Sequence, residues 1–250
     1  MKLDVQSDRA QFAPGAAEAP QPSLRLLQKS VYRGPHLFSG LPMIRLQIDL
    51  GRLESWPTDR LPGFAERLVG LLPGLASHGC SYKTPGGLLK RLEEGTWLGH
   101  VIEHVALELQ TMAGSAVTRG KTRSVKGRPG VYNVLFGYRY EAVGSAAGYA
   151  ALRLVNSLLP LELQGLEGLE GAEVPFDLAA ELGTLKALVR QSALGPTTAA
   201  LVAEAERRDI PVSRLNDQSL LRLGWGRRQK ILRASITGDT SLIAVETAAS

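Results

Sequence analysis

Thr96–Met112 has the sequence TWLGHVIEHVALELQTM, the most strongly patterned stretch of the chain. Its apolar residues recur every three or four positions, a spacing that predicts an amphipathic helix. Thr96 is the candidate N-cap, and Gly114 follows shortly after the expected C-terminal end. The side expected to face the core consists of Leu98, Val101, Ile102, Val105, Leu109 and Met112.

Patterned segments on both sides of this helix predict an α+β fold. Alternating apolar residues predict strands, and helical spacing predicts further helices. The expected strands are Leu24–Val31, Met43–Leu50, Val117–Val125 and Val131–Tyr138, and the expected helices are Leu61–Leu72, Pro85–Glu94 and Glu141–Leu159. This order favours an antiparallel sheet backed by helices. Gly144, Ala147, Gly148 and Ala151 give the last helix a small-residue face for close packing.

The composition divides the chain into three parts. Residues 1–22 are rich in Ala and Pro and have no apolar period, which predicts a flexible leader, and residues 23–160 form the expected domain. A stretch rich in Gly and Glu then opens residues 161–250, a linker and the start of an incomplete second unit. Its expected elements are helices over Leu178–Gln191 and Thr197–Arg208, an extended segment over Ile210–Leu215, and short strands over Ile231–Ala234 and Leu242–Val245.

Bulk composition excludes several classes of protein. With 44% hydrophobic and 21% charged residues among 250, the chain is unlike a globally disordered one. It has no run of about 18 uncharged apolar residues, so no membrane span is expected. The single cysteine, Cys80, cannot form an internal disulfide, and no signal peptide is recognisable. We therefore expect a cytoplasmic protein. The net charge of +5 does not by itself indicate a partner.

His100, Glu103 and His104 share one stripe of the predicted helix, away from its apolar side. Histidines at positions i and i+4 converge, and neutral imidazole is a common zinc ligand. The carboxylate beside them could take a proton from water as a general base. The string is the H-x-x-E-H pattern of inverzincin metallopeptidases. The alternative is a partly buried histidine cluster without a metal.

A catalytic zinc usually has three protein ligands and one open position, so a third ligand is needed. Glu141 is the first choice, because inverzincins use a glutamate on a later helix. Glu108 is the competitor, since it continues the stripe on the same helix. His78 and Cys80, in the loop before Pro85, are the third possibility.

A basic run free of acidic residues spans the two strands after this helix. It contains Arg119, Lys121, Arg123, Lys126 and Arg128. It is either a solvated β-turn or a surface that binds an anionic chain. No aromatic residue interleaves within it and no nucleic-acid-binding motif accompanies it, which disfavours DNA or RNA.

The chain resembles the N-terminal domain of the cyanophycin synthetase family. The motifs that carry this resemblance are Arg33-Gly34-Pro35, Ile48-Asp49-Leu50, Pro62-Gly63-Phe64, His78–Ser81, Glu94–Gln110 and Pro129–Val134. In residues 161–250, Ala193–Thr198 and Thr240–Glu246 resemble the entry into the ATP-grasp domain of that family.

The resemblance implies a function. Family members are cytoplasmic oligomers that use ATP and Mg²⁺ to add Asp and Arg to cyanophycin, a polymer with an Asp backbone and Arg side chains. Their N-terminal domain holds the polymer, and in many members its H-x-x-E-H helix carries a metallopeptidase-like zinc site that cuts polymer into primers. We expect such a domain here, followed by an incomplete α/β segment that precedes ATP-grasp, too short to ligate or to bind ATP productively. The alternative is a non-catalytic polymer anchor with a vestigial metal site.

Overall fold

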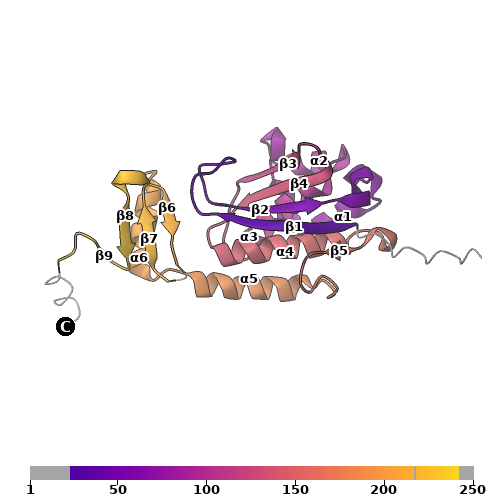
Figure 1. The fold of residues 1–250 in the computed structure, drawn as a ribbon. Coiled ribbons are helices and arrows are strands. Elements are labelled where there is room, and N and C mark those ends of the chain that lie inside the picture. The colour runs from indigo at the N-terminus through magenta and orange to yellow at the C-terminus, as the bar shows by residue number, and fades with distance from the viewer. Residues whose placement is uncertain (1–22, 217, 242–250) are drawn as a thin grey trace, which may run out of the picture.

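A five-stranded sheet organises the first unit of the protein (Figure 1). The structure, a computed structural model, describes residues 23–216 and 218–241. The strand order is β3-β4-β2-β1-β5, and all neighbours are antiparallel except β1 and β5. The strands are β1 (Leu24–Tyr32), β2 (Met43–Asp49), β3 (Gly120–Val125), β4 (Arg128–Gly137) and β5 (Leu166–Glu167). The predicted antiparallel sheet backed by helices is confirmed.

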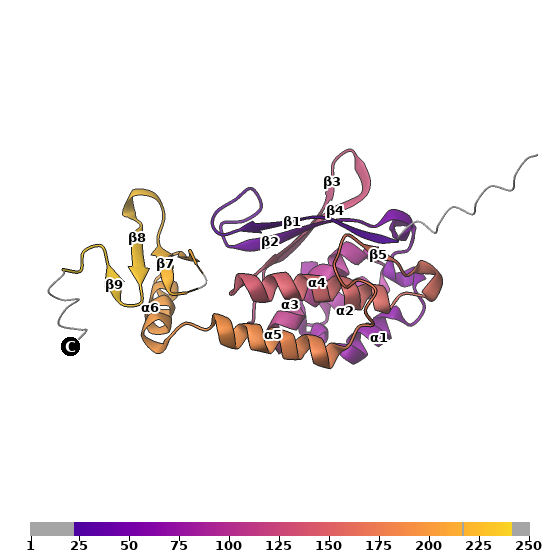
Figure 2. The same ribbon diagram turned by 60° about the horizontal axis from the view of Figure 1, so that its bottom comes forward.

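The helices lie together on one side of this sheet (Figure 2). They are α1 (Phe64–Leu71), α2 (Gly87–Glu93), α3 (Leu98–Met112), α4 (Glu141–Ser157) and α5 (Leu178–Ser192). Short 3-10 helices join them at Gly51–Ser55, Thr58–Arg60, Pro73–Ser77, Cys80–Tyr82 and Leu161–Leu163. No helix among the described residues is long and apolar enough to cross a bilayer.

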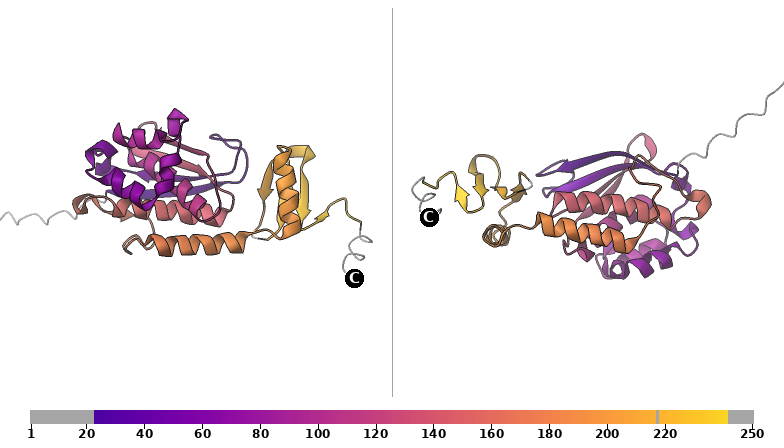
Figure 3. Two further views of the ribbon diagram at one scale, coloured as in Figure 1. Left: turned by 180° about the vertical axis from the view of Figure 1, so that it is seen from behind. Right: turned by 90° about the horizontal axis from the view of Figure 1, so that it is seen from below.

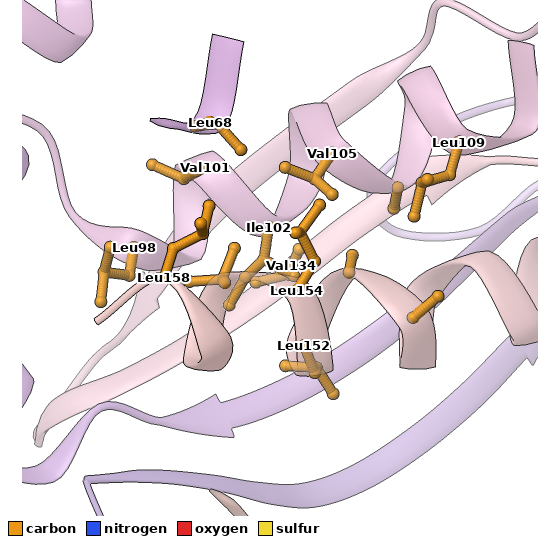
Figure 4. Packing of buried hydrophobic residues seen from close by; sticks show 14 of the residues in the cluster. Leu68, Leu98, Val101, Ile102, Val105, Leu109, Val134, Leu152, Leu154 and Leu158 are labelled. Atoms are coloured by element: carbon orange, nitrogen blue, oxygen red, sulfur yellow. The ribbon is translucent and has the colours of Figure 1, made fainter. Parts of the chain in front are cut away.

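The core lies between the sheet and the two long helices α3 and α4. Ile102 of α3 and Leu154 of α4 meet near Val134 of β4 (Figure 4), and all three are fully buried. The small-residue face of α4 allows this approach: a Cβ added at Gly148 would lie 2.6 Å from Cζ of Phe136. Close packing of this kind buries apolar area that contributes about 25 cal/mol per Å².

The start of α3 differs from the prediction. Trp97, not Thr96, occupies the N-cap position, and no side chain caps the helix. The Thr96 hydroxyl instead lies 3.0 Å from Nδ1 of His100. The hydroxyl thus contacts a side chain one turn ahead, and the helix has no side-chain cap for the N–H groups of its first turn.

The C-terminal part is a smaller unit beyond the end of α5 (Figure 3). Helix α6 (Pro196–Arg207) packs on a four-stranded antiparallel sheet of β6 (Val212–Arg214), β7 (Leu220–Leu223), β8 (Lys230–Arg233) and β9 (Ile236–Thr237), with a 3-10 helix at Gly226–Arg228. Its buried apolar cluster is Val202, Leu221 and Leu232. The sequence analysis missed β5, β7 and β9, while the leader and the strand predicted at Leu242–Val245 lie outside the described residues.

Helix α5 packs with the first unit, although it follows the Gly/Glu-rich stretch. It runs beside α4 in Figures 1 and 3. Leu185 is 1% exposed and belongs to the main apolar cluster, and Arg153 of α4 donates a hydrogen bond 3.1 Å long to the carboxylate of Glu181. The described packing therefore continues to the end of α5.

Candidate metal centre

Helix α3 carries the predicted stripe, but that stripe is covered rather than exposed. Glu103 is 5% and His104 is 7% exposed. Strand β3 and the loop that contains His78 and Cys80 lie over this side of the helix, so α3 is buried on both faces. The expectation of a polar face opposite the core is thus corrected: the stripe lines an open cavity of about 600 Å³ between α3, β3 and the loop.

Three side chains converge in this cavity. Cys80 Sγ lies 3.1 Å and His104 Nε2 lies 3.2 Å from His100 Nε2. The ligand-type atoms of all three residues lie within 4.8 Å of one another. One thiol and two imidazoles form a donor set that suits Zn²⁺.

The loop geometry explains how Cys80 reaches the helix. Cys80 has a φ of +48°, a left-handed backbone conformation that is unusual for a residue other than glycine. The loop then closes on itself, since a Cβ added at Gly87 would lie 2.0 Å from the carbonyl oxygen of Gly79. The tight closure at Gly87 holds the cysteine against the histidine pair.

Burial keeps both histidines neutral. It lowers the pKa of His100 to about 4, assisted by the positive charge of Arg91. It also lowers the pKa of His104 to about 3, and His100 and His78 act in the same direction. Neutral imidazole is the form that binds a metal ion, so both rings have the ligand form at neutral pH.

Glu103 lies beside this cluster in a pocket that strand β3 makes for it. Thr122 Oγ1 donates a hydrogen bond of 2.7 Å to Glu103 Oε2. A Cβ at Gly120 would lie 2.3 Å from Oε1, so the glycine leaves room for the carboxylate. Burial raises the pKa of Glu103 to about 7, against the opposing effects of Thr122 and Arg123. A carboxyl with that pKa can both accept and release a proton near neutral pH.

Neither glutamate predicted as third ligand joins the three converging side chains, although Glu108 lines the same cavity. Glu141, at the start of α4, accepts hydrogen bonds of 2.7 and 2.8 Å from Arg33 and lines a different cavity. Glu108 lies one turn beyond His104, where its Oε2 is 3.0 Å from His78 Nε2. Among the described residues, the group that could hold a metal contains Cys80 and neither glutamate.

The basic residues divide between the cavity and the outer surface. Lys121 and Arg123 of β3 line the cavity that contains Glu103. Arg119, Lys126 and Arg128 are exposed and lie outside its lining.

Thr122 was missed by the sequence analysis. Gly120 and Thr122 both contact Glu103 and are two residues apart on β3, so they share one face of the strand. The alternation of the strand could have placed Thr122 on the same face as Gly120. It could not show that this face packs against Glu103.

Comparisons with known proteins show which proteins the sequence is similar to. Residues 45–160 match the model of the cyanophycin synthase-like N-terminal domain. Over 227 residues, 90% of the chain, the sequence is 40% identical to the cyanophycin synthetases of Geminocystis herdmanii and Trichormus variabilis. It is 37% identical to that of Synechocystis sp. over the same length. The chain spans about a quarter of these relatives, 25%, 24% and 25% respectively.

Proposed function

We propose that this protein binds cyanophycin, because residues 45–160 match the cyanophycin synthase-like N-terminal domain, the family that the sequence resemblance predicted. We further propose that it hydrolyses the aspartate backbone of the polymer and so produces primers. The observation that carries the proposal is the convergence of Cys80, His100 and His104 beside the buried carboxyl of Glu103.

The residues present fit a zinc ion. Cys80 Sγ, His100 Nε2 and His104 Nε2 would hold it, three protein ligands being the usual number in a catalytic zinc site. Bound there, Zn²⁺ would polarise the scissile carbonyl and lower the pKa of a water molecule. With Cys80 in this role, Glu141 is free to pair with Arg33 and Glu108 with His78.

Glu103 would move the proton during cleavage. In its ionised form it accepts a proton from the water whose oxygen attacks the carbonyl carbon. It then gives this proton to the backbone nitrogen as the C–N bond breaks, so that the products are a carboxylate and an amine. The hydrogen bond from Thr122 holds the carboxylate in place during both transfers.

Lys121 and Arg123 would contact the polymer. Both line the cavity beside Glu103, where their positive charges can attract the carboxylate end or the backbone carbonyls of an aspartate chain. Arg119, just before β3, and Lys126 and Arg128, at the turn of the hairpin, would extend this surface.

Zinc analysis and a cleavage assay on the full chain test the proposal. We expect about one Zn²⁺ per chain and shortening of purified cyanophycin, with cleavage lowered at least about 100-fold by Glu103→Gln. Glu170→Gln is the matched control, because Glu170 is exposed and lies outside the cavity. A chain that binds no zinc, with cleavage absent or equal in both variants, would refute the hydrolase. Polymer that still cosediments with the protein would then support the anchor alternative.

The remaining assignments are proposals of the same kind. We place the chain in the cytoplasm, within an oligomeric cyanophycin synthetase, and take residues 161–250 as a linker and the start of an ATP-grasp domain. The resemblance of Ala193–Thr198 to the entry into that domain supports the last assignment. ATP and Mg²⁺ chemistry is assigned to the complete synthetases and not to this chain alone.

A further inference from the structure

Behind the metal-binding side of His104 lies a chain of three polar side chains. His104 Nδ1 is 2.9 Å from His78 Nδ1, and His78 Nε2 is 3.0 Å from Glu108 Oε2. The Glu108 side chain is only 8% exposed and that of His78 only 17%. Neither residue belongs to the group of possible metal ligands among the described residues.

With Glu108 ionised and His78 neutral, the chemistry of the groups sets the direction of both hydrogen bonds. An ionised carboxylate only accepts, so His78 must donate from Nε2 to Glu108. A neutral imidazole that donates from one nitrogen accepts at the other, so His78 Nδ1 accepts a hydrogen bond from His104 Nδ1–H. His104 then has its lone pair on Nε2, the atom 3.2 Å from His100 Nε2.

We infer that Glu108 and His78 are positioning residues that fix the tautomer and orientation of His104. Outer partners of this kind commonly set how firmly a histidine ligand binds a metal. We call Glu108, His78 and His104 the relay. In it Glu108 acts through His78, whereas the sequence suggested Glu108 as a direct metal ligand. The effect of the relay on metal binding rests on the proposed function, whereas the tautomer is a property of the protein itself.

Gly74 shows how closely the fold surrounds this relay. A Cβ added there would lie 1.9 Å from Glu108 Oε1 and 2.6 Å from Cδ, so even one methyl group must displace the carboxylate. Gly70 offers a matched comparison, because a Cβ there meets nothing within 4 Å and neither glycine has a positive φ.

The tautomer can be read directly in the metal-free protein. Long-range ¹H–¹⁵N NMR spectra of the imidazole rings distinguish a proton on Nδ1 from one on Nε2. We expect His104 as the Nδ1–H tautomer in the wild type, and a mixture of tautomers in Glu108→Ala. His104 as the Nε2–H tautomer beside a protonated His78 would overturn the inference, whether or not the protein binds zinc.

Metal affinity tests the consequence. Competition with a chromophoric chelator should show Zn²⁺ binding about 10–100-fold weaker in Glu108→Ala and Gly74→Ala than in the wild type. Glu108→Gln keeps an acceptor oxygen, so its Zn²⁺ affinity should fall less. The Zn²⁺ affinity of Gly70→Ala should equal that of the wild type. The comparison uses variants whose metal-free unfolding temperature equals that of the wild type. Equal Zn²⁺ affinities among these variants would overturn the relay. A wild type that binds no zinc would instead refute the proposed function and leave the tautomer result to decide the relay.

Discussion

Cys80 Sγ lies 3.1 Å from His100 Nε2, across a separation of 20 residues in the chain. The thiol comes from the loop before α2 and the imidazole from the first turn of α3. The donor set therefore depends on the packing of a loop against a helix and is absent from either segment alone. A thiolate binds Zn²⁺ more strongly than a carboxylate does, which gives Cys80 a large share of the expected affinity.

Removing this thiol should abolish tight metal binding. We expect Cys80→Ala to weaken Zn²⁺ binding at least about 100-fold and to remove the sulfur-to-metal charge-transfer band of the Co²⁺-substituted protein. Ser124→Ala changes an exposed serine outside the cavity and should leave both unchanged. Retention of the band in Cys80→Ala would exclude the thiol as a ligand.

Thr122→Val should shift the pH dependence of cleavage. The hydrogen bond from Thr122 lowers the pKa of Glu103, so its loss should raise that pKa further above about 7. Because the base must be ionised, the acid limb of kcat/KM should move to higher pH, by roughly one unit. If Thr122→Val reduces activity but leaves the acid limb of kcat/KM at the same pH, a group other than Glu103 controls that limb.

Glu103 should also affect the stability of the metal-free protein. Its pKa is raised from 4.5 to about 7 in the folded state, so the folded chain binds more protons than the unfolded chain between these values. The contribution of Glu103 to the free energy of unfolding is therefore greatest below about pH 4.5 and is lost as pH rises through about 7. Relative to Glu103→Gln, the wild type should lose stability by at most about 1.4 kcal/mol per pH unit across this window. Parallel denaturant titrations of the two proteins at pH 5, 6, 7 and 8 measure the difference, and parallel pH profiles would contradict it.

The cavity-lining basic residues should affect substrate binding more than chemistry. Lys121→Glu and Arg123→Glu should each raise KM for cyanophycin about tenfold. Lys121→Glu should change kcat less than KM, whereas Arg123→Glu should also lower kcat at neutral pH, because Arg123 lowers the pKa of Glu103. Lys126→Glu, at the exposed turn outside the cavity, should have the smallest effect. An equal rise in KM in all three variants would indicate a general electrostatic attraction between the protein and the polymer. Added salt would screen that attraction.

The elements with a strong period could be predicted, and their register followed from it. The alternation of Ile44, Leu46 and Ile48 placed all three on the inner face of the sheet, where they are fully buried. The short strands β7 and β9, with only four and two residues, carry too little pattern to be recognised.

The helix spacing brought His100 and His104 together, but it could not identify their partners. Cys80 was offered only as the third possibility, because loop packing leaves no periodic signal in the sequence. Thr122 lies on an alternating strand, but alternation does not show that this face packs on Glu103. Glu141 was favoured by analogy, yet the salt bridge to Arg33 holds its carboxylate elsewhere. Which residue acts as the third ligand stays a prediction, and Cys80 is the candidate whose thiol lies beside the two imidazoles.

The backbone conformation at Cys80 sets the stability of the fold against the proposed metal binding. A φ of +48° strains any side chain with a Cβ, typically by about 1 kcal/mol, and glycine would relieve that strain. Selection for stability alone would favour glycine at position 80. Glycine occupies many of the other positions with positive φ in the described residues. A random screen for heat resistance should therefore tend to recover substitutions at position 80 that fold well and no longer hold metal.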